Sequence, residues 1–279
     1  MEKPSIEQLL VKLDKLLDTY VDVAEETADP AKQRAFLWNG RRKSLKPIKR
    51  PAMVREEDLI GIDAIKKEVV MNTKYFVSNK RANNVLLWGE RGTGKSSLVK
   101  SLLTTFSDTN LRMIHVYRHD ILTIPEMYDI VAEHAAYRFI LFIDDLSFEE
   151  GQTDFKEMKT VVDGGLEAIP DNLLFYATSN RKHLIPTKFS DNDSDEIRSS
   201  DTIEEKVSLV ERFGLRFGFY HVTQEAYLEI VDSYARKHQI TMDRDLLERH
   251  AIRWALAAGG RNGRIAEQFV LALMAEITL

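Results

Sequence analysis

In Gly89-Glu90-Arg91-Gly92-Thr93-Gly94-Lys95-Ser96 the sequence matches the phosphate-binding pattern G-x-x-x-x-G-K-[ST] without a gap. The apolar run 85–88 before it predicts a buried parallel strand, and residues 97–103 after it carry apolar pairs one helical turn apart. The pattern therefore stands in the strand–loop–helix context that it requires. A chance glycine-rich turn before a surface lysine would lack both flanks.

The residue types in this loop suit a bound polyphosphate. Glycines at 89, 92 and 94 let the backbone wrap closely and direct its N–H groups to one point, where the new helix adds its positive end. Lys95 supplies a charge for the β- and γ-phosphates, and Ser96 supplies a hydroxyl for Mg²⁺. The residues expected to contact the ligand here are Gly89, Glu90, Arg91, Gly92, Thr93, Gly94, Lys95, Ser96 and Ser97.

Two further strands are expected to end in polar residues. The run 139–143 predicts a core strand with Asp144 and Asp145 at its carboxyl end, which is where open α/β sheets bind ligands. Asp144 would hold Mg²⁺, and Asp145 would orient an attacking water. Asn180 ends the next run, 173–180, and is a candidate hydrogen-bond donor to the γ-phosphate or its water. Solvated turn acids and a plain strand cap are the simpler alternatives.

Composition narrows the class of protein. The 279 residues suffice for one large domain and a small one. The absence of cysteine excludes disulfides, cysteine-ligated zinc and thiol catalysis, and it fits the cytoplasm, which is the expected location. No apolar stretch is long enough to span a bilayer, so no membrane association is expected. A net charge of −5 argues against a general nucleic-acid coat and leaves room for a local basic patch.

The N-terminal part is predicted to be helical. Residues 1–39 carry an apolar stripe at helical spacing, broken at Asp29-Pro30, with a second short helix expected at 31–38. Packing on the protein's own core and docking to a partner are both open interpretations of this stripe. Residues 41–51 hold six positive charges and two prolines, which favours an exposed linker. Contact with phosphate is the alternative, although no aromatic residue is interleaved for base stacking.

The remaining elements follow from periodicity and turn residues. Residues 186–201 are acidic and aperiodic, and they are interpreted as a solvated loop rather than a calcium site, since no EF-hand glycine or glutamate completes the pattern. The other elements expected are helices at 64–76, 125–137, 155–168 and 203–213, strands at 113–117 and 217–221, and a helical tail at 225–237, 243–258 and 264–277.

Together these features resemble the AAA+ family of ATPases over roughly residues 53–279. The sequence looks closest to a little-characterised bacterial group of single-module AAA+-like proteins of unknown function. The phrases that carry this closer match are Leu141-Phe142-Ile143-Asp144-Asp145-Leu146-Ser147-Phe148, Tyr176-Ala177-Thr178-Ser179-Asn180-Arg181 and Arg212-Phe213-Gly214-Leu215.

The resemblance implies an α/β fold of the P-loop NTPase type, with a parallel five-stranded sheet and flanking helices. It implies an N-terminal helical extension and basic linker at 1–52, a nucleotide-binding domain at 53–221, and a small helical lid at 222–279. The N-terminal 52 residues fall outside the resemblance.

The resemblance also assigns roles to individual residues. Leu59-Ile60-Gly61 matches the segment that lines the adenine pocket, with Ile60 and Gly61 expected to contact the nucleotide. Residues 89–96 match Walker A, and Asp144 with Asp145 matches Walker B. Asn180 matches sensor 1. The two arginine positions are less distinctive, because Arg216 and Arg261 are alternatives to them: Arg212 stands where an arginine finger reaches the neighbouring subunit, and Arg264 matches the sensor 2 arginine bound in cis.

One departure bears on catalysis. Most of the family has glutamate after the magnesium-binding aspartate, whereas this chain has Asp145, which is one methylene shorter. Turnover is therefore expected to be slow, or confined to an assembled oligomer. No peptide-pore signature and no helix-turn-helix is visible.

These expectations favour an ATPase that uses ATP and Mg²⁺, forms a nucleotide-dependent homo-oligomer, and remodels or loads an unknown protein or nucleic-acid client. A nucleotide-gated switch or scaffold with little hydrolysis is the alternative. A small-molecule P-loop kinase would lack a role for Arg212 and Arg264. A GTPase would carry an N-K-x-D run, and Asn180-Arg181-Lys182-His183 lacks its acid.

Overall fold

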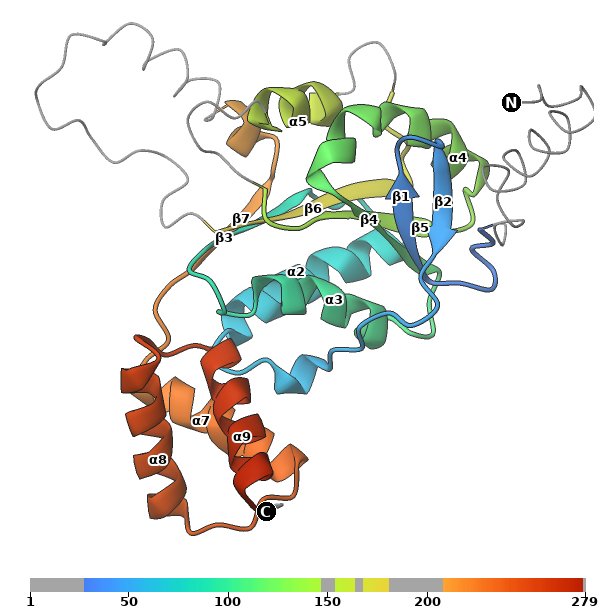
Figure 1. Ribbon diagram of the computed structural model, residues 1–279. Coiled ribbons are helices and arrows are strands. Elements are labelled where there is room, and N and C mark those ends of the chain that lie inside the picture. Colours follow the sequence, from blue (N-terminus) through green and yellow to red (C-terminus); the bar gives the residue numbers. More distant parts are fainter. Residues whose placement is uncertain (1–27, 147–153, 164–167, 181–207, 278–279) are drawn as a thin grey trace, which may run out of the picture.

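A mixed sheet with helices on both faces forms the main part of the protein (Figure 1). The computed structural model describes residues 28–146, 154–163, 168–180 and 208–277. Within them the sheet has seven strands in the order β2-β1-β4-β5-β6-β3-β7, all parallel except β2, which runs antiparallel to β1. The strands are β1 Ala35–Asn39, β2 Ser44–Pro47, β3 Val85–Gly89, β4 Leu111–Val116, β5 Arg138–Ile143, β6 Leu173–Ser179 and β7 Leu215–Phe219.

The α/β class is thus confirmed, and the number of strands is corrected from five to seven. The central strands are apolar on both faces because helices cover both faces. On one face lie α2 (Asp63–Val77) and α3 (Lys95–Thr105), preceded by the short η1 (Glu56–Asp58). The elements on the other face are η2 Arg118–Thr123, η3 Pro125–Met127, α4 Tyr128–Glu133 and α5 Asp154–Asp163.

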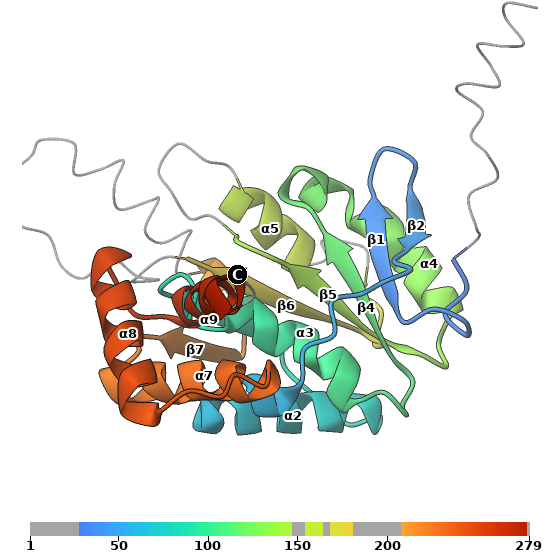
Figure 2. The ribbon, with the colours of Figure 1, turned by 60° about the horizontal axis from the view of Figure 1, so that its bottom comes forward.

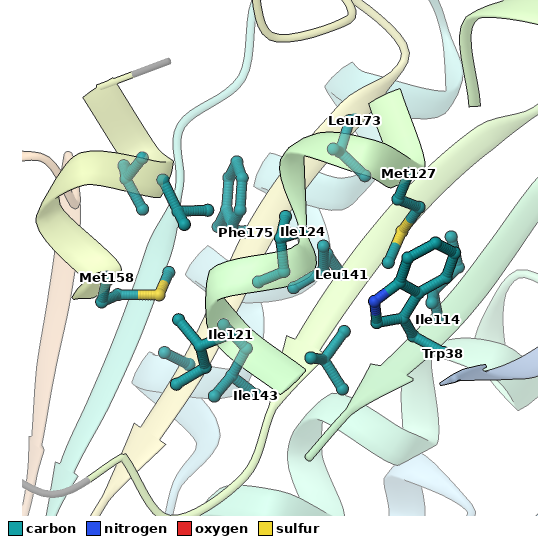
Figure 3. Packing of buried hydrophobic residues seen from close by; sticks show 14 of the residues in the cluster. Trp38, Ile114, Ile121, Ile124, Met127, Leu141, Ile143, Met158, Leu173 and Phe175 are labelled. Atoms are coloured by element: carbon teal, nitrogen blue, oxygen red, sulfur yellow. The ribbon is translucent and has the colours of Figure 1, made fainter. Parts of the chain in front are cut away.

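The two additional strands come from the N-terminal part, where the expected helix at 31–38 and linker at 41–51 are wrong. Phe36 and Trp38 are buried on one face of the sheet while Ala35 faces the other, which is the two-residue period of a strand. Trp38 packs among Ile114 and Met127, as Figure 3 shows, and its Nε1 donates to Thr123 Oγ1 at 2.8 Å. The helix predicted from the apolar stripe before Asp29-Pro30 falls in residues 1–27, which lie outside the described residues.

Arg34 anchors this hairpin to the rest of the domain. Its guanidinium donates to the carbonyl oxygens of Leu103 and Phe106, at the carboxyl end of α3. A cation at this end of a helix satisfies carbonyls that have no partner within the helix and complements the helix dipole. Residues 30–48 are therefore part of the folded domain rather than a tether.

Other predicted boundaries shift by a few residues. The helix expected at 125–137 is divided into η3 and α4 and ends at Glu133, and the helix expected at 155–168 is described as α5 over Asp154–Asp163, with residues 164–167 outside the described residues. The acidic loop 186–201 and residues 203–207 of the helix expected at 203–213 lie outside the described residues; residues 208–211 of that helix are helical.

The carboxyl-terminal helices are α7 Gln224–Lys237, α8 Arg244–Ala257 and α9 Gly263–Ile277, as the periodicity predicts. Thr223 and Asp243 cap the first two by accepting bonds from Ala226 N and Leu246 N. The three helices enclose a hydrophobic cluster of their own, and they lie away from the β1–β2 hairpin in both Figure 1 and Figure 2. None of the helices that the structure describes has the length and apolar character of a membrane span.

Replacing Trp38 with alanine tests whether the hairpin is part of the domain core. Trp38 is 1% exposed, so Trp38→Ala should lower the free energy of unfolding by about 3–5 kcal/mol in urea denaturation followed by circular dichroism. Trp254→Ala in α8 is the matched control, because that side chain is 38% exposed and should cost clearly less. Equal costs for the two variants would contradict a structural role for the hairpin.

Candidate functional site

The three polar segments singled out in the sequence meet at one edge of the sheet. The glycine-rich loop follows β3, the two aspartates follow β5, and Asn180 follows β6. Because β5, β6 and β3 are neighbours and parallel, their carboxyl ends lie side by side. The register pairs Ile143 with Ala177 and Trp88 with Ser179, which sets the ends of the three strands next to one another.

The loop after β3 has a backbone that only glycine adopts without strain. Gly89 has φ 125°, and a Cβ there would stand 2.0 Å from the carbonyl oxygen of Phe219 in β7. Gly94 has φ 96° and caps α3, which begins at Lys95. The unpaired N–H groups of the first turn of α3 therefore face the concave side of the loop, which is the geometry of an anion site.

Lys95 lies at the centre of this loop. Its side chain is buried, and Nζ donates to the carbonyl oxygens of Gly89 at 2.9 Å and Glu90 at 2.5 Å. Burial lowers the pKa of Lys95 to about 8, against which the charges of Asp145 and Asp144 act in part. A buried ammonium held by neutral carbonyls is stabilised further by any anion that enters the loop.

Asp144 links the ends of all three strands. Its Oδ1 accepts hydrogen bonds from Ser96 Oγ at 2.5 Å and from Thr178 Oγ1 at 2.6 Å. A hydroxyl and a carboxylate are ligands of the kind that Mg²⁺ prefers, and Mg²⁺ commonly completes its shell with water and substrate phosphates. The Ser96 hydroxyl and the Asp144 carboxylate, 2.5 Å apart, fit Mg²⁺ bound in that mode.

Asp145 takes an unusual backbone conformation for a non-glycine residue. Its φ is 59°, in the left-handed region, and its N–H donates to Thr178 Oγ1 at 2.9 Å. The side chain is directed to Asn180, whose Nδ2 donates to Asp145 Oδ1 at 2.5 Å. Non-glycine residues in this region are often found at functional sites, where surrounding bonds hold the strain. Here the chain turns sharply after Asp144 and brings Asp145 and Asn180 into contact.

Thr178 is a site residue that the sequence analysis missed. Its hydroxyl donates to the carboxylate of Asp144 and accepts from the backbone of Asp145, so one buried side chain fixes both acids. Its carbonyl also accepts from Leu146 N at 2.7 Å. The available signal was a hydroxyl two residues after the inward-facing Tyr176, on the same face of the strand.

A cavity of about 890 Å³ opens in front of these groups. It lies between the loop, the segment 58–65 and the carboxyl-terminal helices α7 and α9, which together with α8 are called the lid from here on. Its volume is within the range of small-molecule sites. The predicted site residues that line it are Ile60, Gly61, Arg91, Gly92, Thr93, Gly94, Lys95, Ser96, Ser97, Asp144, Asp145, Asn180 and Arg264.

Part of the cavity wall is apolar. Leu59, Ile62 and Ile230 contribute aliphatic side chains, and Tyr234 contributes a ring whose pKa is raised by burial and by the nearby carboxylates of Glu267 and Asp58. Such a surface suits a flat heterocyclic base, while the loop end suits phosphates. The cavity thus offers surfaces for both the base and the phosphates of a nucleotide.

The lid touches the glycine-rich loop directly. Gly263 N, at the start of α9, donates to the carbonyl oxygen of Gly92 at 3.0 Å. Gly92 has no room for a side chain, because a Cβ would stand 2.6 Å from Asn262. Lys237 Nζ in α7 also pairs with Asp58 Oδ2 at 2.8 Å. A movement of the loop would therefore be transmitted to the lid.

Three predicted residues do not line the cavity. Gly89 and Glu90 take part through the carbonyls that hold Lys95, and the Glu90 carboxylate lies 2.8 Å from His221 Nδ1, a cavity residue that sequence reasoning missed. Arg212 lies elsewhere: it is exposed just before β7, and its carbonyl oxygen accepts from Asn84 Nδ2 at 3.4 Å. The alternatives for the arginine roles, Arg216 and Arg261, are exposed and do not line the cavity either.

Comparisons with known proteins agree with this architecture. The chain is similar to the RuvB Holliday junction branch migration motor of Thermotoga maritima, with 14% identity, a TM-score of 0.54, and coverage of 82% of this chain and 66% of that chain. A mutant of RuvB gives 15% identity, a TM-score of 0.55, and coverage of 80% and 65%. PCH-2 of C. elegans gives 16% identity, a TM-score of 0.50, and coverage of 76% and 62%.

The chain spans less than two thirds of each of these solved chains, and the likeness shows the fold of AAA+ ATPases. A search of curated proteins found no match. A family model matches residues 31–277, so the matched region includes the β1–β2 hairpin that the sequence analysis had placed outside the resemblance. The chain belongs to the family described as "Protein of unknown function (DUF815)", and its fold is that of the AAA+ ATPases.

Proposed function

We propose that this protein is an ATPase that binds ATP with Mg²⁺ in the cavity between the glycine-rich loop and the lid. One observation carries the proposal. Ser96 Oγ and Asp144 Oδ1 lie 2.5 Å apart, next to the buried ammonium of Lys95, at the N-terminus of α3. A hydroxyl, a carboxylate, a buried cation and a cradle of N–H groups together are the requirements for a metal-bound polyphosphate.

Binding would use the two ends of the cavity differently. Backbone N–H groups of residues 91–97 and the amine of Lys95 would hold the phosphates, and Arg264 at the start of α9 would add charge from the lid. The base would lie against Ile60, Gly61 and the apolar side chains beyond them. Ser96 and Asp144 would hold Mg²⁺, which neutralises charge on the phosphate oxygens when bound.

Hydrolysis would depend on Asp145 and Asn180. The carboxylate of Asp145 would accept a proton from the attacking water, and the Asn180 amide, which donates to that carboxylate, would hold it in one orientation. Phosphoryl transfer needs mainly positioning and charge stabilisation, so the shorter reach of Asp145 implies slow turnover. The same shortness favours a second candidate, a nucleotide-gated switch that binds ATP and hydrolyses little of it.

Arg212 would complete the site of a neighbouring subunit. It lies next to the edge strand β7 and outside its own cavity, which supports action in trans rather than in cis. An arginine finger contributes about 10³–10⁵ in rate, so a homo-oligomer would be the active form. The activity would drive remodelling or loading of a client macromolecule. The cysteine-free sequence is compatible with the cytoplasm, which we take as its compartment.

Lys95→Ala tests the binding site. Because a buried charged donor is lost, the Kd of a non-hydrolysable ATP analogue should rise between about 10-fold and 100-fold in calorimetric titrations with Mg²⁺. Affinity of the unaltered protein should also fall as the pH rises above about 8, where the amine of Lys95 loses its proton. Asp145→Asn is the matched comparison, since it should retain binding and lose hydrolysis. Equal loss of binding in both variants would mean that the role of Asp145 is wrong.

Thr178→Val tests the positioning of the two acids. Valine keeps the shape of threonine but removes the bonds to Asp144 and to the backbone of Asp145, so the Mg²⁺ concentration for half-maximal hydrolysis should rise at least about fivefold. Thr178→Ser keeps the hydroxyl and should restore the Mg²⁺ response. If valine and serine behave alike, Thr178 only fills space.

A mixing experiment tests the trans arginine. Arg212→Ala and Lys95→Ala should each be inactive alone, for different reasons. In a mixture, an Arg212→Ala subunit keeps its own Lys95 and can receive Arg212 from a neighbouring Lys95→Ala subunit, so ATP hydrolysis should return in part. Free phosphate rather than a phosphorylated small molecule should be the product. No recovery on mixing would place the action of Arg212 in cis or remove it from catalysis.

A further inference from the structure

The turn of the β1–β2 hairpin is a concentrated basic surface. Arg41, Arg42 and Lys43, here called the hairpin tip, are exposed, and Lys46, Lys49 and Arg50 continue along the edge strand β2 and past its end. The whole chain carries a net charge of −5, so this basic cluster is a local feature. Lys43 Nζ lies 2.7 Å from Glu126 Oε1.

The hairpin tip is held in a fixed place. Gly40, just before it, is buried so closely against η2 that a Cβ would stand 2.2 Å from Thr123 Oγ1 and 2.6 Å from Asp120 Oδ1. Trp38 also donates to Thr123. Since β1 runs parallel to β4, the tip lies at the carboxyl edge of the sheet, directly beside the residues that follow β4 (Figure 1).

Those residues supply the aromatic surface that the basic stretch itself lacks. Tyr117, immediately after β4, is 47% exposed and stacks on the exposed His119, with ring centroids 5.6 Å apart and an interplanar angle of 16°. His119 lies 3.4 Å from Asp120. Cations beside exposed, stacked aromatic rings are the combination by which proteins bind unpaired nucleic acid strands.

We propose that the hairpin tip and the Tyr117–His119 pair bind single-stranded nucleic acid. The cations of the tip meet the phosphates, and a base stacks on the ring of Tyr117. A duplex offers no free base faces to these rings, and an acidic protein surface would use the cations but leave the rings without a partner. Two acidic groups at this surface are paired within it: Asp120 with His119 and Glu126 with Lys43.

The same surface is connected to the candidate catalytic acids. Tyr117 lies edge-on to His115 with centroids 4.9 Å apart, and His115 stacks on Phe142 at 5.6 Å. Phe142 is in β5, two residues before Asp144. A strand bound at Tyr117 would thus press on the element that carries Asp144 and Asp145. This connection rests on the proposed ATPase function, whereas the binding itself does not.

Binding is tested with fluorescein-labelled oligothymidylate by fluorescence anisotropy, without nucleotide. The tip variant is Arg41→Ala/Arg42→Ala/Lys43→Asn, with asparagine at 43 because that φ is 52° and asparagine tolerates it. It should bind at least about tenfold more weakly, and its dependence of log Kd on log salt should be shallower by about 2. The control is Lys74→Ala/Lys80→Ala/Arg81→Ala, which removes three exposed cations, one in the last turn of α2 and two between α2 and β3, and should stay within about twofold.

Tyr117→Ala tests how much base stacking on this ring contributes to the affinity for oligothymidylate. It should weaken binding at least about fivefold, and Tyr117→Phe should not, because phenylalanine keeps the ring face. Polyglutamate should not displace the oligonucleotide. The proposal is overturned if the unaltered protein fails to bind oligothymidylate at low salt, or if the control triple variant loses as much affinity as the tip variant. An unchanged affinity of Tyr117→Ala together with displacement by polyglutamate would instead identify an acidic protein partner. These readouts are independent of whether ATP is hydrolysed.

Discussion

The hydrogen bonds that meet at one oxygen of Asp144 hold the candidate site together. Ser96 reaches that oxygen from the first turn of α3, and Thr178 reaches it from β6. Three segments separated by tens of residues in the chain are thereby fixed at one point. Charge-assisted hydrogen bonds of this kind are stronger than neutral ones, and in a partly buried setting their geometry is well defined. The glycine-rich loop, the acids and Asn180 depend on this point for their relative positions.

The central part of this arrangement could be predicted from the sequence because it follows from local patterns and one topological rule. The loop motif predicts a strand before it and a helix after it. Parallel strands place their carboxyl ends together, which brings Asp144 to Ser96. The role of Thr178 could not be predicted, since its partners lie 33 and 34 positions away and a threonine in a buried strand is unremarkable. The hairpin was missed because a four-residue apolar run fits a helix or a strand equally well, and only contact with β4 decides.

The hairpin also changes how the edges of the sheet should be understood. β2 has four residues, ends in Pro47 and carries the exposed Lys46, all of which discourage pairing with a further strand. That edge is therefore closed to strand addition and offers charge instead. At the other edge, β7 follows Arg212 and carries Arg216 on its exposed face. The proposed subunit contact at Arg212 and the proposed polyanion contact at the hairpin therefore belong to opposite edges of the same sheet.

The candidate site lies between these two edges, and its contacts connect it to both. On the β7 side, Gly92 joins the lid through Gly263, so a ligand that reshapes the loop must also move α9 or break that bond. On the hairpin side, ring contacts lead from Tyr117 through His115 to Phe142 in β5. A bound triphosphate can affect both only through differences in contact energy between two arrangements of the same packed elements. Asp145 is the residue best placed to make that difference, because its left-handed backbone is kept by two hydrogen bonds, to Thr178 and Asn180, that a ligand in the cavity would alter.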